Sequence, residues 1–166
     1  MKGIKKTIRC ADSSRVKPLE GSYIDRCTLK NADYLFSLDC DRMLYSIRSY
    51  AGIDTLGKTH YSGWEQSGHG IFFGHYLHAL CLLYQTAKGL HPEVAEEAKR
   101  RVDYMVDSLA ECRRAIDEKV GSGPDYPEIP GYLCPLPAWT LTHAQNCFRR
   151  PGAHDATALP FYDNHK

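Results

Sequence analysis

Residues 70–87, GIFFGHYLHALCLLYQTA, are apolar on nearly every side when they are placed on a helix. A helix at the surface of a soluble protein normally keeps one polar face, so this segment predicts a helix with neighbours all round it. Gly89 follows closely and predicts where the helix ends. A chain that contains such a helix needs further elements to cover it.

Two amphipathic segments flank the apolar one and predict outer helices. The first spans residues 28–50 and ends before Gly52, and the second begins at Pro92 and ends near Gly121. In both, apolar residues recur every three or four positions. The order of one outer helix, one inner helix and a second outer helix predicts an all-α fold built as an α/α toroid. A plain helical bundle is the alternative. The first stripe is Leu29, Ala32, Phe36, Cys40, Met43, Ile47 and Tyr50.

The remaining sequence sets the expected boundaries. Residues 1–27 predict an extended lead-in, with Pro18 and Gly21 as helix breakers. Proline becomes frequent after Gly121, which predicts a mostly irregular C-terminal segment with one short helix near residues 138–147. The expected organisation is a lead-in over 1–27 followed by one helical region over 28–166.

Composition narrows the classes of function. The 166 residues carry 21 Lys and Arg against 20 Asp and Glu, a balance that favours neither nucleic acid nor an anionic membrane as a partner. The longest apolar run, Ala79 to Tyr84, is too short to span a bilayer. The seven cysteines include no CxxC pair, and the first residues lack the apolar stretch of a signal peptide. A cytoplasmic protein without disulfides is the expectation, with Cys40, Cys81 and Cys112 inside helices.

Several motifs give a resemblance to a known family. The segments LDCDRMLY (38–45), GWE (63–65), GHYLHAL (74–80), PGYLCPLP (130–137) and ALPFYDNHK (158–166) occur in the order seen in glycoside hydrolase family 127. These proteins are the β-L-arabinofuranosidase-like enzymes, formerly a domain of unknown function. The resemblance covers residues 29–166 and implies the opening helical hairpins of an (α/α)6 barrel.

The resemblance also implies what the chain does not contain. In the family, the zinc-binding cysteine and glutamate cluster, the cysteine nucleophile and the acid/base glutamate all lie beyond the position matching Lys166. We therefore assign no catalytic residue, metal ligand or cofactor to this chain, and we expect it to be inactive by itself. The barrel would also be incomplete, which predicts that Phe72, Phe73, Leu80 or Leu83 is partly exposed.

A carbohydrate substrate is the expected partner, and five residues are its candidate contacts. Loops that enter inner helices line the mouth of a toroid, and residues 60–69 form such a loop. Trp64 offers an apolar plane for a sugar ring and Glu65 a hydrogen-bond acceptor, although they could instead plug the barrel end and cap the helix. His69 at the helix entrance is either a pocket residue or a cap, and His75 is either a ligand contact or a buried core histidine. His165 completes the set.

Other patterns favour structural roles or a different class. Asp39 and Arg42, three residues apart on the expected first helix, predict a structural ion pair. Cys134, His143, Cys147 and His154 match no familiar zinc spacing. The alternative to a hydrolase is a non-catalytic helical interaction module, or a truncated gene product. In either case the remainder of the barrel, or a second copy of the chain, would cover the exposed apolar surface.

Overall fold

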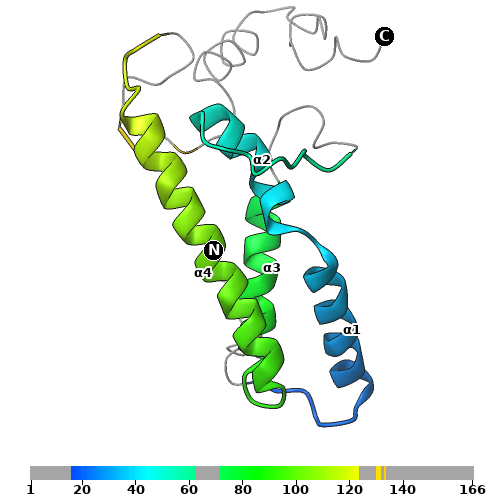
Figure 1. Ribbon diagram of the computed structural model, residues 1–166. Helices are drawn as coiled ribbons and strands as arrows, with labels where there is room; N and C mark the ends of the chain where they lie inside the picture. Colours follow the sequence, from blue (N-terminus) through cyan, green and yellow to red (C-terminus); the bar gives the residue numbers. More distant parts are fainter. Residues whose placement is uncertain (1–15, 63–71, 124–129, 132, 134–166) are drawn as a thin grey trace, which may run out of the picture. The chain divides into compact units, whose positions relative to one another are not determined.

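The computed structural model describes residues 16–62, 72–123, 130, 131 and 133. Within these residues the chain forms four α-helices and no strand, which confirms the predicted all-α class. They are α1 (Tyr23–Ser37), α2 (Cys40–Ala51), α3 (Phe72–Ala87) and α4 (Pro92–Asp117) (Figure 1). The chain divides into two compact units, one containing residues up to Leu38 with Tyr76–Val102, the other Asp39–His75 with residues from Asp103 onward. No helix in the described part is long and apolar enough to cross a membrane.

Helix α1 begins within the segment expected to be extended. The hydroxyl of Ser22 accepts a hydrogen bond from the N–H of Asp25 at 3.2 Å, so Ser22 caps the helix and Tyr23 is its first residue. The carboxylate of Asp25 is buried and accepts from the N–H of Gly21 at 2.8 Å and from Nε2 of His91 at 2.6 Å. These bonds, the one from His91 first, lower the pKa of Asp25. They tie the start of α1 to the turn before α4.

The single helix expected over residues 28–50 is in fact two helices. Leu38 and Asp39 have extended backbone conformations and separate α1 from α2. The carboxylate of Asp39 accepts the N–H groups of Asp41 and Arg42 at 2.8 and 3.3 Å, which makes Asp39 the N-cap of α2. The three-and-four spacing of apolar residues continues across this break, so periodicity alone could not reveal it.

The first unit packs α1 against α3 and the N-terminal part of α4, with α3 antiparallel to both (Figure 1). Arg101 closes the C-terminal end of α1, where carbonyl groups have no partner within the helix. Its guanidinium donates to the carbonyl oxygens of Phe36 and Leu38, each at 2.8 Å, and to the hydroxyl of Tyr76 at 3.0 Å. The apolar core of this unit comprises Ala32, Leu35, Tyr76, Leu80, Leu83, Ala87, Ala95 and Ala98.

The second unit packs α2 against the C-terminal part of α4. Helix α2 ends at Gly52, as predicted, where φ is +71°, a left-handed conformation that glycine adopts without strain. Nζ of Lys119 donates to the carbonyl oxygen of Ala51 at 2.7 Å and secures the same helix end. The core of this unit comprises Met43, Leu44, Ile47, Ala51, Met105, Leu109, Cys112 and Ile116.

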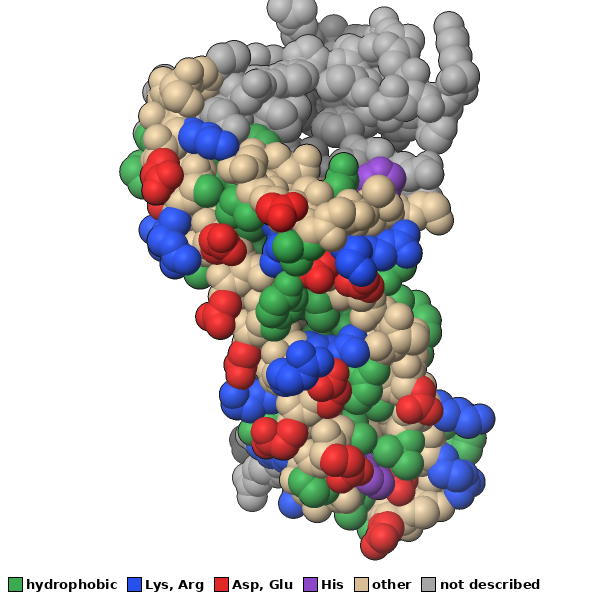
Figure 2. Space-filling model, in the orientation of Figure 1, with side chains coloured by type: hydrophobic (Ala, Val, Ile, Leu, Met, Phe, Trp, Pro, Cys, Tyr) green, Lys and Arg blue, Asp and Glu red, His purple; other side chains and the backbone are tan. Residues whose placement is uncertain are grey.

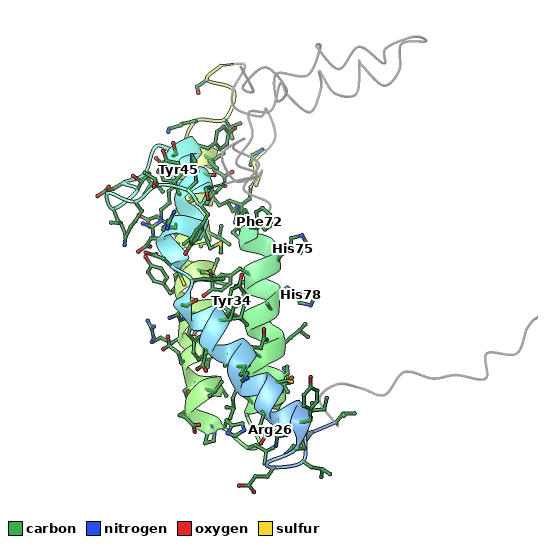
Figure 3. All side chains as sticks on the ribbon, turned by 90° about the vertical axis from the view of Figure 1, so that its right-hand side faces the viewer. Arg26, Tyr34, Tyr45, Phe72, His75 and His78 are labelled. Atoms are coloured by element: carbon green, nitrogen blue, oxygen red, sulfur yellow. The ribbon has the colours of Figure 1, made fainter. Side chains whose placement is uncertain are left out.

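Helix α3 is not surrounded as its apolar sequence predicts. Its residues His75, His78, Cys81, Leu82 and Gln85 are exposed among the described residues, and Figure 3 shows His75 and His78 projecting from the helix on its outward side. Of the four side chains expected to be partly open, Phe72 is 41 % exposed and Phe73 is half-buried, but Leu80 and Leu83 are buried. The exposed leucine of α3 is instead Leu82, at 48 % exposure.

The four described cysteines form no disulfide with one another, and all four lie in helices. Cys112 is buried in the core, and this burial raises the pKa of its thiol. Cys40 is half-buried and Cys81 is exposed, although both lie inside helices as predicted. Cys10, Cys134 and Cys147 lie outside the described residues, as does the short helix expected near residues 138–147.

Acidic and basic side chains are interspersed over the face shown in Figure 2. On α4, Glu97 accepts from Nε of Arg101 and from Nε of Arg100, each at 2.7 Å. The Glu97–Arg101 pair has the i,i+4 spacing that favours ion pairs on a helix. The hydrogen bonds from Arg100 and then Arg101 outweigh the effect of burial and lower the pKa of Glu97 to about 2.

The contrast between Leu80 and Leu82 predicts two different stabilities. Leu80→Ala should lower the free energy of unfolding by about 2–5 kcal/mol, because it opens a cavity in a closed core. Leu82→Ala, on the exposed side of the same helix, should cost no more than about 0.5 kcal/mol beyond its change in helix propensity. Urea unfolding followed by circular dichroism measures both. Equal losses would show that α3 is covered on both sides in solution.

Glu97 predicts a loss of stability in acid. Its pKa is depressed in the folded chain, so its contribution is complete above the unfolded value of 4.5 and is lost as the pH falls towards about 2. The Glu97→Gln variant should therefore be less stable than the wild type at neutral pH and nearly equal to it near pH 2. Unfolding free energies measured between pH 2 and 7 test this, and a constant difference across that range would contradict it.

Candidate functional site

Four of the five candidate sugar contacts, Trp64, Glu65, His69 and His165, lie outside the described residues. The fifth, His75, lies near the start of α3 with an exposed side chain (Figure 3). The interpretation of His75 as a buried core histidine is therefore wrong, and a role in ligand contact stays a prediction. His78, three residues further along α3, is also exposed.

The described structure does show what holds the chain just before Trp64. The segment 53–62 leaves the end of α2 and returns to its beginning, where it meets the motif LDCDRMLY. Asp39 is the centre of this contact. Its N–H donates to the hydroxyl of Tyr61 at 2.8 Å, and its carboxylate accepts from Nζ of Lys58 at 2.8 Å while it caps α2. One residue thus starts the helix and binds the returning loop.

Opposing influences act on the pKa of Asp39. Burial alone would raise it, but the hydrogen bond from Lys58 and the two backbone N–H groups of α2 together lower it. The same contact raises the pKa of Lys58. The carboxylate is therefore ionised at neutral pH and committed to these donors, which fits a structural group better than a general acid.

The side chain of Arg42 binds the backbone of the returning loop. Its Nε donates to the carbonyl oxygen of Thr59 and its Nη2 to that of His60, both at 3.2 Å. Its guanidinium also lies over the ring of Tyr61, 3.9 Å from the ring centre. The ion pair expected between Arg42 and Asp39 is thus replaced by contacts to the loop, because Asp39 receives the backbone N–H of Arg42 rather than its side chain.

Arg48 holds the other end of the same loop. This arginine is buried and its Nη1 donates to the carbonyl oxygen of Asp54 at 3.4 Å. Its Nη2 donates to Tyr104 and Ser108 of α4 at 3.1 and 2.9 Å and lies 3.7 Å from the carboxylate of Asp41. We call the two arginines, with the loop carbonyls that they bind, the arginine tether.

Tyr104 links α4 to the motif. Its hydroxyl donates to the carboxylate of Asp41. Burial, followed by this hydrogen bond to a carboxylate, raises the pKa of Tyr104. Four charged residues therefore stabilise the packing of α2 against its loop and α4. They are Asp39, Asp41, Arg42 and Arg48.

His60 and Tyr45 complete the contact between the loop and α2. Their rings meet edge to face, with centres 5.5 Å apart and planes at 71°. Nδ1 of His60 lies 2.8 Å from the carbonyl oxygen of Tyr61. The sequence does not single out His60 or Tyr61, although a histidine and a tyrosine directly before SGWE are a signal of an aromatic contact.

Within the described ranges, no group of three or more His, Cys, Asp or Glu residues is placed to hold a metal ion. The weak zinc candidates Cys134, His143, Cys147 and His154 lie outside those ranges. The described residues therefore do not form a zinc site, and no step of a reaction is assigned to a metal here.

Comparison with models of known protein families identifies the family of this chain. Residues 15–147 match the family model described as Beta-L-arabinofuranosidase, GH127 catalytic domain. The chain belongs to this family. The match includes all four described helices, the arginine tether and the GWE segment, and the GH127 catalytic domain is an (α/α)6 barrel. Neither the curated proteins nor the solved structures include a match to this chain.

The GH127 motif at residues 38–45 predicts a measurable difference between two substitutions. Asp39→Ala removes the cap of α2 and the partner of Lys58, so it should cost about 1–2 kcal/mol of unfolding free energy. Asp39→Asn keeps a good capping side chain and loses only the exposed ion pair, so its cost should be less than about half of that. Urea unfolding compares the two variants. Equal losses would mean that the ion pair, not the cap, is the stabilising element.

Proposed function

We propose that this chain is the sugar-binding part of a GH127 catalytic domain that hydrolyses β-L-arabinofuranosyl linkages. The observation that supports this most directly is the family match over residues 15–147, which spans the described helices and the segment with Trp64 and Glu65. A cytoplasmic location is part of the proposal, and it agrees with the lack of a disulfide among the four described cysteines.

The proposed sugar contacts are Trp64, Glu65, His69, His75 and His165. An indole plane packs against the apolar face of a sugar ring, and carboxylate and imidazole groups bind its hydroxyls. Two observations support this assignment. The chain that leads into Trp64 is held at both ends by the arginine tether. His75 has the exposure that a ligand contact needs.

We propose that hydrolysis of the glycosidic bond requires residues other than those that the structure describes. A retaining glycosidase places a nucleophile and a proton donor on either side of one bond. The most firmly placed carboxylates have other partners: Asp25 binds His91, Asp39 caps α2, Asp41 accepts from Tyr104, and Glu97 binds two arginines. Burial raises the pKa of the Cys112 thiol, which disfavours the thiolate that a nucleophile requires.

A second candidate function is a non-catalytic helical interaction module. It is favoured by the exposed side of α3, where Leu82 is 48 % exposed, and by Tyr34 on α1, which is 62 % exposed. Light scattering of the purified chain separates the candidates. A monomer that binds sugar supports the hydrolase part, whereas stable self-association that Leu82→Lys abolishes supports the module.

The proposed function predicts selective sugar binding without hydrolysis. Saturation-transfer NMR with the 166-residue chain should detect methyl β-L-arabinofuranoside and give no comparable signal for methyl α-D-glucopyranoside, the control ligand. Trp64→Ala should weaken binding by about tenfold because it removes the stacking plane. Equal signals from the two glycosides would contradict the proposal.

The same preparation should release p-nitrophenol from its β-L-arabinofuranoside no faster than buffer does, because none of its residues is assigned as nucleophile or acid. Hydrolysis clearly above this background would locate both groups within residues 1–166 and would overturn that part of the proposal.

A further inference from the structure

His91 lies directly before α4, and one of its two ring nitrogens binds a buried carboxylate. Nε2 lies 2.6 Å from Oδ1 of Asp25, and the same carboxylate accepts from the N–H of Gly21 at 2.8 Å. An ionised carboxylate can only accept, so Nε2 carries the hydrogen of this bond. In a neutral imidazole the other nitrogen, Nδ1, then carries a lone pair that can bind a metal ion.

Nδ1 of His91 is open to solvent. Among the described side chains, Nε of Arg48 is the one buried nitrogen or oxygen atom without a hydrogen bond. Nδ1 of His91 forms no hydrogen bond with the described residues, so it is not a buried atom. Oε1 of Glu93 lies 4.0 Å from it, on a side chain that is 72 % exposed. A ligand from solution therefore reaches an imidazole nitrogen and a carboxylate side by side, within the first compact unit.

An imidazole nitrogen and a carboxylate oxygen are both ligands for first-row transition-metal ions such as Ni²⁺. Bonds from such ions to nitrogen and oxygen are about 2.1 Å long, so two ligand atoms on opposite sides of one ion are about 4.2 Å apart. The observed separation of 4.0 Å between Nδ1 of His91 and Oε1 of Glu93 is close to this. Because the side chain of Glu93 is exposed, it can also rotate to a neighbouring position on the ion.

Asp25 provides the support that a metal-binding histidine requires. Such a histidine usually donates its other ring N–H to a carboxylate, which fixes the ring and makes the free nitrogen a stronger ligand. Asp25 is buried and bound to the turn before α1, so it holds the ring of His91 before an ion arrives. The positive end of the α4 dipole opposes a cation, but it amounts to about half a charge, whereas Asp25 and Glu93 each carry a full negative charge.

We propose that Nδ1 of His91 and the carboxylate of Glu93 bind one divalent transition-metal ion, with water completing its coordination and Asp25 as the positioning residue. Two protein ligands are fewer than the groups of three that the described residues lack. The site uses none of the residues proposed to bind sugar, so it does not depend on the proposed function. A bound ion stabilises the folded state, because the unfolded chain does not hold these two ligands together.

Nickel is the probe, and resonances near His91 are the readout, because thiols elsewhere in the chain also bind nickel. Amide ¹H–¹⁵N spectra of the 166-residue chain are recorded during titration with NiCl₂ at slightly alkaline pH, since the metal binds only the neutral ring. Paramagnetic Ni²⁺ should broaden the signals of His91, Glu93 and Asp25 saturably. If these signals keep their intensity at millimolar nickel, Glu93 only forms an ion pair with His91 and the inference is overturned.

Substitutions separate metal binding from packing. Glu93→Gln removes a charged ligand from an exposed position and should weaken nickel binding at His91 by about tenfold or more. Asp25→Asn removes the supporting charge and should weaken it by about 10–100-fold. The matched control is Glu111→Gln, the same change at another exposed glutamate of α4, which should bind as the wild type does. Circular dichroism checks that each variant is folded. Unchanged nickel affinity at His91 in Glu93→Gln would overturn the inference.

Discussion

The N-cap formed by Asp39 is the interaction on which the described region around α2 depends. Its side chain starts α2, its carboxylate binds Lys58, and its own N–H donates to Tyr61. Because α2 starts at Cys40, Arg42 lies in its first turn, where its side chain reaches the returning loop. In a helix that continued unbroken from α1, Asp39 would have no free capping position, and the N–H that Tyr61 receives would be bonded within the helix.

Three arginines each use the guanidinium group to bind at least one backbone carbonyl. Arg42 and Arg48 bind the two ends of the loop after α2, and Arg101 binds the C-terminal end of α1. A guanidinium has five donors in a fixed plane, so it can satisfy two carbonyls and still contact a ring or a hydroxyl. Lysine could not replace it at these positions, because an ammonium group is compact and lacks the planar fork.

Sequence patterns located helix ends more reliably where a glycine or proline marks them. Gly52 and Pro92 define the end of α2 and the start of α4 as predicted. The break at Asp39 was missed because the three-and-four spacing of apolar residues continues through it in the sequence. The exposure of Leu82 was missed because an apolar sequence shows only that burial is favourable, not that a neighbour is present. The contacts of His60 and Tyr61 with α2 and its cap join residues 15 to 22 positions apart, beyond the reach of local pattern.

The arginine tether would contribute most to the binding free energy of a ligand that binds weakly. A dissociation constant near 1 mM corresponds to only about 4 kcal/mol of binding free energy. Ordering one flexible side chain on binding costs about 0.5–1.5 kcal/mol, so ordering three of them would remove between about a third and all of that binding free energy. A loop whose carbonyls are already bound by Arg42 and Arg48 avoids part of this cost before the sugar arrives. On this argument the two arginines would support the proposed sugar binding without touching the sugar.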